Sequence, residues 1–174
     1  MLVATGFSEL LKGGDPRSLG RIAEVIEAVL ADRSRCRELF ECLFSDDETV
    51  RMRAADGLEK VAARRPDMIE PFTPELLGPV AEIAQPSVQW HLAEILGEIS
   101  LSAADRRRAT RILKRNLESS EDWIVIGDTM QTLTGFAESD AGLRAWLLPA
   151  LRRHRDSGRK AVAKRAQKCL TRLG

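Results

Sequence analysis

The chain has 174 residues, of which 44% are hydrophobic and 30% are charged, with 12 glycines and 7 prolines. This balance is too apolar for a disordered chain and too unbiased for collagen, so we expect a globular protein with a substantial core. The formal net charge is only +1, from 27 basic and 26 acidic residues, which argues against a dedicated nucleic-acid or membrane-surface protein unless the charge is unevenly distributed.

The cysteines and the amino terminus indicate the cell compartment. Cys36, Cys42 and Cys169 form no CxxC pair and are odd in number, which favours reduced thiols over a secreted disulfide framework. The opening stretch MLVATGFSELLKGGD lacks the basic start and long apolar run of a signal peptide. No segment approaches the roughly 20 apolar residues that cross a bilayer. We therefore expect a cytoplasmic protein that does not associate with membranes.

Apolar residues recur at spacings of three and four along the whole chain, which predicts an all-α fold. Phe7, Leu10 and Leu11 begin a first short helix, a turn follows at residues 13–16, and Ile22, Ile26, Val29 and Leu30 mark the next helix. Longer helix pairs come after it. Their first helices are predicted near residues 33–44, 67–84, 103–118 and 140–153. Their second helices are predicted to follow Asp46, Ala84, Ser120 and Gly158.

The second helices repeat one pattern. Their segments align without gaps, and the equivalent valines are Val50, Val88, Val125 and Val162, at spacings of 38, 37 and 37 residues. A fixed period of this length, with a helix pair in each unit, is typical of an α-solenoid. We therefore predict one repeat domain over residues 1–174, an α-α superhelix of about four to five helix pairs.

Residues 45–68, SDDETVRMRAADGLEKVAARRPDM, contain the acidic turn, the Val50 and Arg51 pair and the small-residue helix of a HEAT repeat. Together with VQWHLAEIL from Val88, the chain resembles a family of small bacterial HEAT-repeat proteins. The resemblance implies an armadillo-like helical scaffold that binds other proteins, and it implies no enzymatic activity.

Arg51 is predicted to have a structural role, pairing with an acidic turn residue such as Asp46 or Asp47. The later repeats depart from the HEAT pattern, because Ile126 and Ala163 stand where Arg51 does. We therefore expect contacts between acidic turns and this arginine to fail after Ser120.

The face of each second helix opposite its valine should line the concave surface of the solenoid. Trp90 lies on this face, and Met52 is its neighbour one repeat away. An apolar centre with a charged rim is typical of a protein interface. The predicted partner-binding residues are Met52, Arg53, Asp56, Trp90, His91 and Glu94. The alternative is that Trp90 packs on an adjacent helix or loop, as we expect of Trp123 and Trp146.

The charge is unevenly distributed along the chain. Residues 152–174 contain nine basic residues and one acidic residue, whereas residues 1–151 contain 18 basic and 25 acidic residues. The predicted contacts to an anionic partner are Lys164, Arg165, Lys168 and Arg172. The acidic residues in the middle of the predicted groove are Asp56, Glu94, Glu98 and Asp128. Two alternatives to protein binding therefore remain, namely nucleic-acid binding through the last helix and self-association of the basic end with the acidic groove of a second copy.

The sequence predicts no catalytic residue, metal site or cofactor. It has two histidines and neither a GxSxG nor a nucleotide-binding glycine motif. His91 and Glu94 could share a metal ion, but nothing in the sequence supplies the other ligands. Bacterial alkylpurine DNA glycosylases also use HEAT-like helices, and Trp90 with Glu94 superficially suits that analogy. The acidic middle of the groove would repel a duplex, so a non-enzymatic scaffold is the preferred interpretation.

Overall fold

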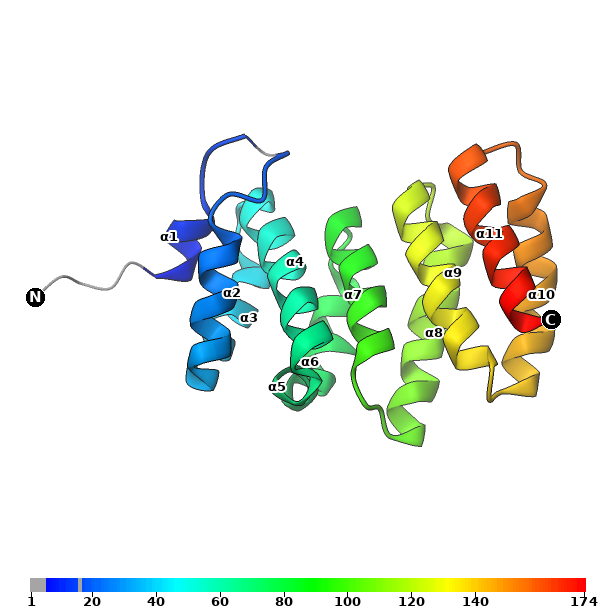
Figure 1. Ribbon diagram of the computed structural model, residues 1–174, viewed down its shortest axis with the longest axis horizontal. Helices are drawn as coiled ribbons and strands as arrows, with labels where there is room; N and C mark the ends of the chain where they lie inside the picture. Colours follow the sequence, from blue (N-terminus) through cyan, green and yellow to red (C-terminus); the bar gives the residue numbers. More distant parts are fainter. Residues whose placement is uncertain (1–5, 16) are drawn as a thin grey trace, which may run out of the picture. The chain divides into compact units, whose positions relative to one another are not determined.

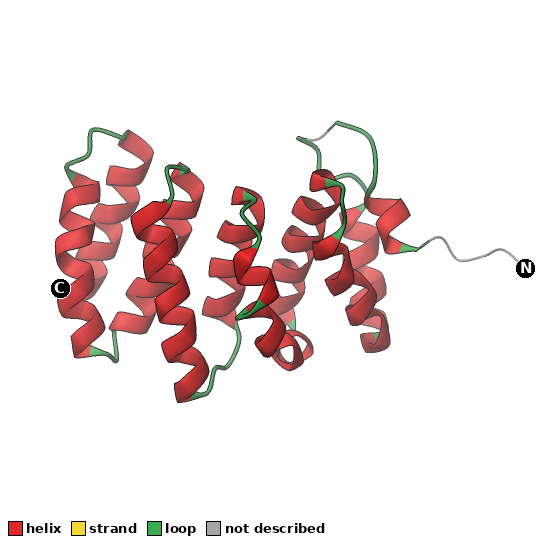
Figure 2. Cartoon of the chain, turned by 180° about the vertical axis from the view of Figure 1, so that it is seen from behind, coloured by secondary structure: helices red, strands yellow, loops and turns green. Residues whose placement is uncertain are grey.

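The computed structural model describes residues 6–15 and 17–174. Over these residues it is helical with no strand, which confirms the predicted all-α repeat fold (Figure 2). Pro16 of the predicted turn and the first five residues of the amino-terminal stretch lie outside the described residues. In the described ranges, none of the helices combines the length and apolar character that crossing a bilayer requires.

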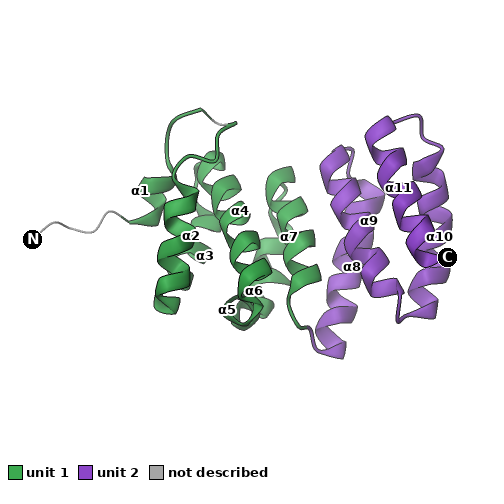
Figure 3. Cartoon of the chain, in the orientation of Figure 1, with its two compact units in different colours: residues 1–100 green, residues 101–174 purple. Residues whose placement is uncertain are grey.

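The chain, predicted as one repeat domain over 1–174, divides into two compact units, residues 1–100 and 101–174 (Figure 3). The helices of the first unit are α1 (Phe7–Leu11), α2 (Ile22–Ala31), η1 (Arg33–Arg35), α3 (Cys36–Glu41), η2 (Cys42–Phe44), α4 (Glu48–Arg64), α5 (Pro66–Ile69), η3 (Glu70–Phe72), α6 (Thr73–Leu76), η4 (Pro79–Glu82) and α7 (Pro86–Glu98). Those of the second are α8 (Ala103–Ser119), α9 (Trp123–Ala137), α10 (Ala141–Arg155) and α11 (Lys160–Leu173).

The continuous helix predicted near 67–84 is wrong. The segment instead forms the short pieces α5, η3, α6 and η4. Each piece has a proline in its first two positions, at Pro66, Pro71, Pro74 and Pro79. A proline has no amide N–H and clashes with the preceding helical turn, so it begins a helix more easily than it continues one.

α4 is the central helix of the first unit and packs against α2 and α7 (Figure 1). Asp47 begins it as N-cap, with its Oδ1 accepting from the amides of Thr49 and Val50 at 2.8 and 3.4 Å. The apolar face is fully buried, and small residues allow the neighbours to come close. At Gly57 a Cβ atom would lie 2.6 Å from Cδ1 of Ile22, so α2 and α4 pack tightly because this position has no side chain.

Arg51 joins the two repeats of the first unit. Its Nη1 donates to the backbone carbonyls of Ser45 and Asp46 at 2.7 and 3.2 Å, and its Nε donates to Oε1 of Gln85 at 2.7 Å. The amide of Gln85 in turn donates to the Glu48 carbonyl at 2.9 Å. Arg51 thus has a structural role at the acidic turn, but its partners there are carbonyl oxygens rather than the predicted carboxylates of Asp46 or Asp47.

The second unit is made of α8 to α11, with α9 packed against α8, α10 and α11 (Figure 1). Ile126, at the position of Arg51, is buried. Other arginines join the two repeats of this unit. Arg159 is one of them, and its Nη2 donates to the Glu121 carbonyl at 2.7 Å.

The two tryptophans that were expected to pack differ in the structure. Trp146 is half-buried, with Nζ of Lys114 4.2 Å from its ring centroid. Trp123 is 46% exposed, so its prediction as a packing residue is wrong. Trp123 precedes the buried Val125 by two residues, which is about 200° around the helix, and therefore faces away from the core.

Candidate functional site

The candidate site of the first unit lies along α4 and α7, which are neighbours in Figure 1. α4 supplies Met52, Arg53 and Asp56, and α7 supplies the residues one repeat later, Trp90, His91 and Glu94. All six were expected on an exposed stripe. The structure places three of them, Arg53, Asp56 and His91, in the buried class. All three flank the stripe. Asp56 and His91 are covered because α4 and α7 pack side by side, and Arg53 is covered by the loop between α1 and α2.

Arg53 is only 1% exposed, so the prediction that it is accessible to a binding partner is wrong. Its guanidinium holds the loop between α1 and α2. Nε donates to the Ser18 carbonyl at 3.0 Å, and Nη2 donates to the Asp15 carbonyl at 3.0 Å. Nη1 donates to the carbonyls of Leu11 and Gly13, each at 2.7 Å. The planar fork of an arginine can serve several acceptors at once, so its role is to order this loop.

Asp56 and His91 are 6% and 8% exposed, so neither offers the open rim that the sequence predicted. They belong to a buried polar cluster between α4 and α7. His91 Nδ1 lies 3.0 Å from Glu94 Oε2, and His91 Nε2 lies 3.9 Å from Asp56 Oδ1. Glu94 remains half-buried at the edge of the cluster. The predicted residues are therefore brought together, but as an internal network.

Two residues that sequence reasoning missed complete this cluster. Lys60 Nζ donates to Asp56 Oδ1 at 3.2 Å and to Glu59 Oε2 at 2.5 Å. Partial burial lowers the pKa of Lys60, but the hydrogen bond to Glu59 and the charge of Asp56 outweigh it, so the pKa is raised overall. A signal was available, because Asp56, Glu59 and Lys60 are three and four residues apart and share a helix face.

The cluster contains one polar atom that the protein does not satisfy. Asp56 Oδ2 is buried without a hydrogen-bond partner. A buried acceptor without a donor costs free energy, more so when it belongs to a charged group. Potential ligand atoms of Asp56, Glu59 and His91 lie within 4.8 Å of one another. The cluster therefore differs from an ordinary salt bridge, because it combines three such groups with an unsatisfied carboxylate oxygen.

Met52 and Trp90 are half-buried, so each keeps part of its side chain accessible. The Trp90 ring lies beside the imidazole of His91, with centroids 5.6 Å apart and planes inclined at 55°. The alternative that Trp90 packs within the protein thus applies to part of the ring. The remaining surface, with Met52 and Glu94, is what this face can offer a partner.

The basic residues of α11 divide into two kinds. Arg165 is half-buried and paired with Asp128, which is itself only 6% exposed, and Nε of Arg172 donates to Glu138 Oε1 at 2.6 Å. Arg172 also lowers the pKa of Glu138 through this hydrogen bond. Lys164 and Lys168 are exposed. The prediction that Asp128 lies on the open groove is wrong. Asp128 is buried because Arg165 covers it from the neighbouring helix.

Three of the four predicted anion-binding residues line one small cavity of about 160 Å³ between α9 and α11. Its lining residues are Gln131, Thr134, Arg165, Lys168, Cys169 and Arg172. Because Arg165 and Arg172 are already paired with carboxylates, Lys168 contributes the uncompensated charge at this point.

The division into units also divides the charge. Residues 1–100 contain 18 acidic and 11 basic residues, a net charge of −7, and residues 101–174 contain 8 acidic and 16 basic residues, a net charge of +8. The near-neutral total therefore conceals an acidic unit and a basic unit, each with its own preference for partners.

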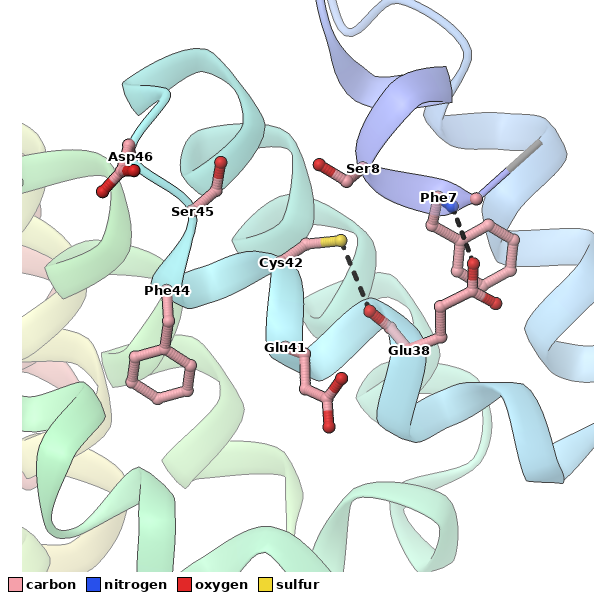
Figure 4. Close-up of a pocket in the computed structure, with 9 residues that line it drawn as sticks. Phe7, Ser8, Glu38, Glu41, Cys42, Phe44, Ser45 and Asp46 are labelled. Atoms are coloured by element: carbon pink, nitrogen blue, oxygen red, sulfur yellow. Dashed lines mark hydrogen bonds between the residues drawn. The ribbon is translucent and has the colours of Figure 1, made fainter.

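A wider cavity of about 420 Å³ lies beside α1 and α3, lined by Glu38, Glu41 and Asp46 among others (Figure 4). Phe44 also lines this cavity, and the residue is 48% exposed. The Glu38 carboxylate is already used, since it accepts from the Phe7 amide at 2.7 Å and from Arg35. The acidic lining suits a cationic group, but the lining residues of this cavity include no buried polar atom without a partner.

Comparisons with known proteins assign no family. No protein-family model matches the chain, and a search of curated proteins also gives no match.

Proposed function

We propose that this chain is a non-enzymatic HEAT-like helical-repeat module that binds a protein partner on the α4 and α7 face of its first unit. The observation that carries the proposal is the pair Met52 and Trp90, two large apolar side chains left partly accessible at equivalent positions of adjacent helices. Partly exposed aromatic and methionine side chains are enriched at interface centres. The all-α repeat fold supports a scaffold, because such repeats present extended surfaces for binding.

The charge of the first unit defines the partner chemistry. With a net charge of −7 on residues 1–100, and with Glu94 beside Trp90, this face favours a basic amphipathic segment. Such a segment would place an apolar side chain against Met52 and Trp90 and lysines or arginines over the acidic surroundings. Helix-in-groove recognition uses this combination of apolar anchors and complementary charge.

The test compares two synthetic amphipathic helices that share one apolar face, one with lysines and the other with glutamates on the polar face. We expect the basic peptide to bind, as measured by fluorescence anisotropy, and to lose affinity at least about tenfold in the double variant Met52→Ala, Trp90→Ala. Trp123→Ala is the matched control, because Trp123 is exposed on the second unit. Equal binding by the wild type and the double variant would contradict the proposal, as would equal binding of the two peptides.

A second candidate function rests on the second unit. Its net charge of +8 and the exposed Lys164 and Lys168 on α11 favour a polyanionic partner such as a nucleic acid. Binding of duplex DNA or of RNA should weaken steeply with salt and be abolished by Lys164→Glu with Lys168→Glu. Lys12→Glu, which changes charge by the same kind of substitution on the first unit, should change it little. If neither DNA nor RNA shows salt-sensitive binding, the nucleic-acid function is refuted.

Self-association follows from the same division of charge, because the basic unit of one copy can attract the acidic unit of another. Sedimentation at low and high salt separates it from the other two functions, since a head-to-tail contact would raise the mass only at low salt. We place all three functions in the cytoplasm, because the odd number of cysteines without a CxxC pair favours reduced thiols.

A further inference from the structure

The buried cluster between α4 and α7 has the composition of a metal site. We propose that Asp56, Glu59 and His91 bind a divalent first-row transition metal ion, with zinc the best match to one imidazole and two carboxylates. This inference goes beyond partner binding, and its test needs no partner.

The geometry brings the three ligands within reach of one ion. Asp56 and Glu59 are three residues apart on α4 and share a face, and His91 approaches from α7. His91 Nε2 and Asp56 Oδ1 are 3.9 Å apart, which is too long for a hydrogen bond. It is within the roughly 4.2 Å that two bonds of about 2.1 Å to the same zinc ion can span.

The imidazole is oriented as a metal ligand. Its Nδ1 is 3.0 Å from Glu94 Oε2, and because an ionised carboxylate can only accept, Nδ1 donates. In the neutral ring the lone pair then resides on Nε2, the nitrogen nearer Asp56. A metal-binding histidine typically donates its other N–H to a carboxylate in this way, which fixes its orientation.

Asp56 supplies an independent indication. The residue is 6% exposed, and its Oδ2 is buried without a hydrogen-bond partner. Lys60 reaches only the other oxygen, Oδ1. A cation bound between the helices would stabilise a carboxylate that the protein leaves incompletely paired.

Lys60 acts as the competing cation in this cluster. Its ammonium lies 3.2 Å from Asp56 Oδ1 and 2.5 Å from Glu59 Oε2, so it compensates the same two carboxylates that the ion would use. The side chain is 45% exposed and can swing into solvent. The ion must displace the Lys60 ammonium in order to bind, which opposes binding. When the Lys60 side chain moves into solvent, it also opens a path for the ion to the two carboxylates.

The experiment titrates the full chain, first freed of metal by a chelator, with Zn²⁺ in a calorimeter and with Co²⁺ in a visible spectrophotometer. We expect saturable one-to-one binding and Co²⁺ bands of a nitrogen and oxygen ligand set, without the thiolate charge-transfer band that a cysteine would give. Glu94→Gln, which removes the orienting carboxylate, should weaken binding about 10- to 100-fold. His91→Gln should weaken it at least as much.

Lys60→Gln gives a test in the opposite direction, since loss of the competing charge should tighten binding at least about tenfold. This residue is at the surface, so the variant should fold even if changes at the buried Asp56 do not. His154→Gln is the matched control, because His154 is half-buried on α10 outside the cluster. The proposal is overturned if neither metal binds, if His91→Gln binds as tightly as the wild type, or if Lys60→Gln weakens binding.

Discussion

Replacing Arg53 with methionine should detach the loop between α1 and α2. Methionine keeps the apolar stem but removes the hydrogen bonds to Leu11, Gly13, Asp15 and Ser18. A hydrogen bond to a charged group contributes about 1.5–3 kcal/mol. The two shortest bonds, at 2.7 Å, therefore account for at least about 3 kcal/mol, while the longer ones involve carbonyls that water can reach after the change.

The assay combines urea denaturation with limited proteolysis by trypsin, because the loop contains cleavable residues at Lys12, Arg17 and Arg21. A loss of about 3 kcal/mol raises the population of the open loop, and so the cleavage rate there, by about a hundredfold. Arg53→Lys should lower the stability and raise the rate of loop cleavage nearly as much, because an ammonium cannot reach all of the carbonyls to which the guanidinium donates.

The control is Arg64→Met, the same substitution on the same helix. Arg64 makes an exposed ion pair with Glu27 at 2.8 Å, so we expect a loss below about 1 kcal/mol and no change in loop cleavage. If Arg53→Met costs no more than Arg64→Met, or if the loop is cut no faster, the reasoning about Arg53 is refuted.

Three further predictions concern packing, thiol reactivity and capping. Gly57→Ala should lower the free energy of unfolding in urea, because a crowded Cβ costs about 1–3 kcal/mol against roughly 1 kcal/mol gained in helix propensity. Gly142→Ala, whose new Cβ would meet nothing closer than 3.4 Å, should instead raise it. Burial raises the pKa of the Cys36 and Cys42 thiols from 9.0 to about 11. Both thiols should therefore react slowly with a disulfide reagent at pH 8 in the native protein and rapidly in urea. Fast reaction in the native protein would contradict this prediction. Asp122→Ala should cost about 1 kcal/mol in thermal unfolding, because the carboxylate caps α9 at 2.8 and 3.0 Å; an unchanged melting temperature would show the cap to be unimportant.

The sequence was sufficient for the second helix of each pair and for much of the core, but not for the segment near 67–84, which its prolines divide into short pieces. The valines at its repeat period, from Val50 to Val162, are all buried. α4 and α9 begin just after Asp46 and Ser120, as predicted, with Asp47 and Asp122 as their N-caps. These features are local or periodic, and a helix of 3.6 residues per turn converts them directly into a buried face.

Only the tertiary structure decided the surroundings of the polar residues on the other face. Arg53 is buried because a loop some 35 to 42 residues earlier in the chain folds over it. Asp56 and His91 are buried because α4 packs on α7. The helical periodicity specifies the direction of each side chain around the helix axis, but it contains no information on which other helix or loop covers that side chain. The division of the +1 net charge into −7 and +8 could be counted from the sequence, yet assigning these charges to two compact units required the fold.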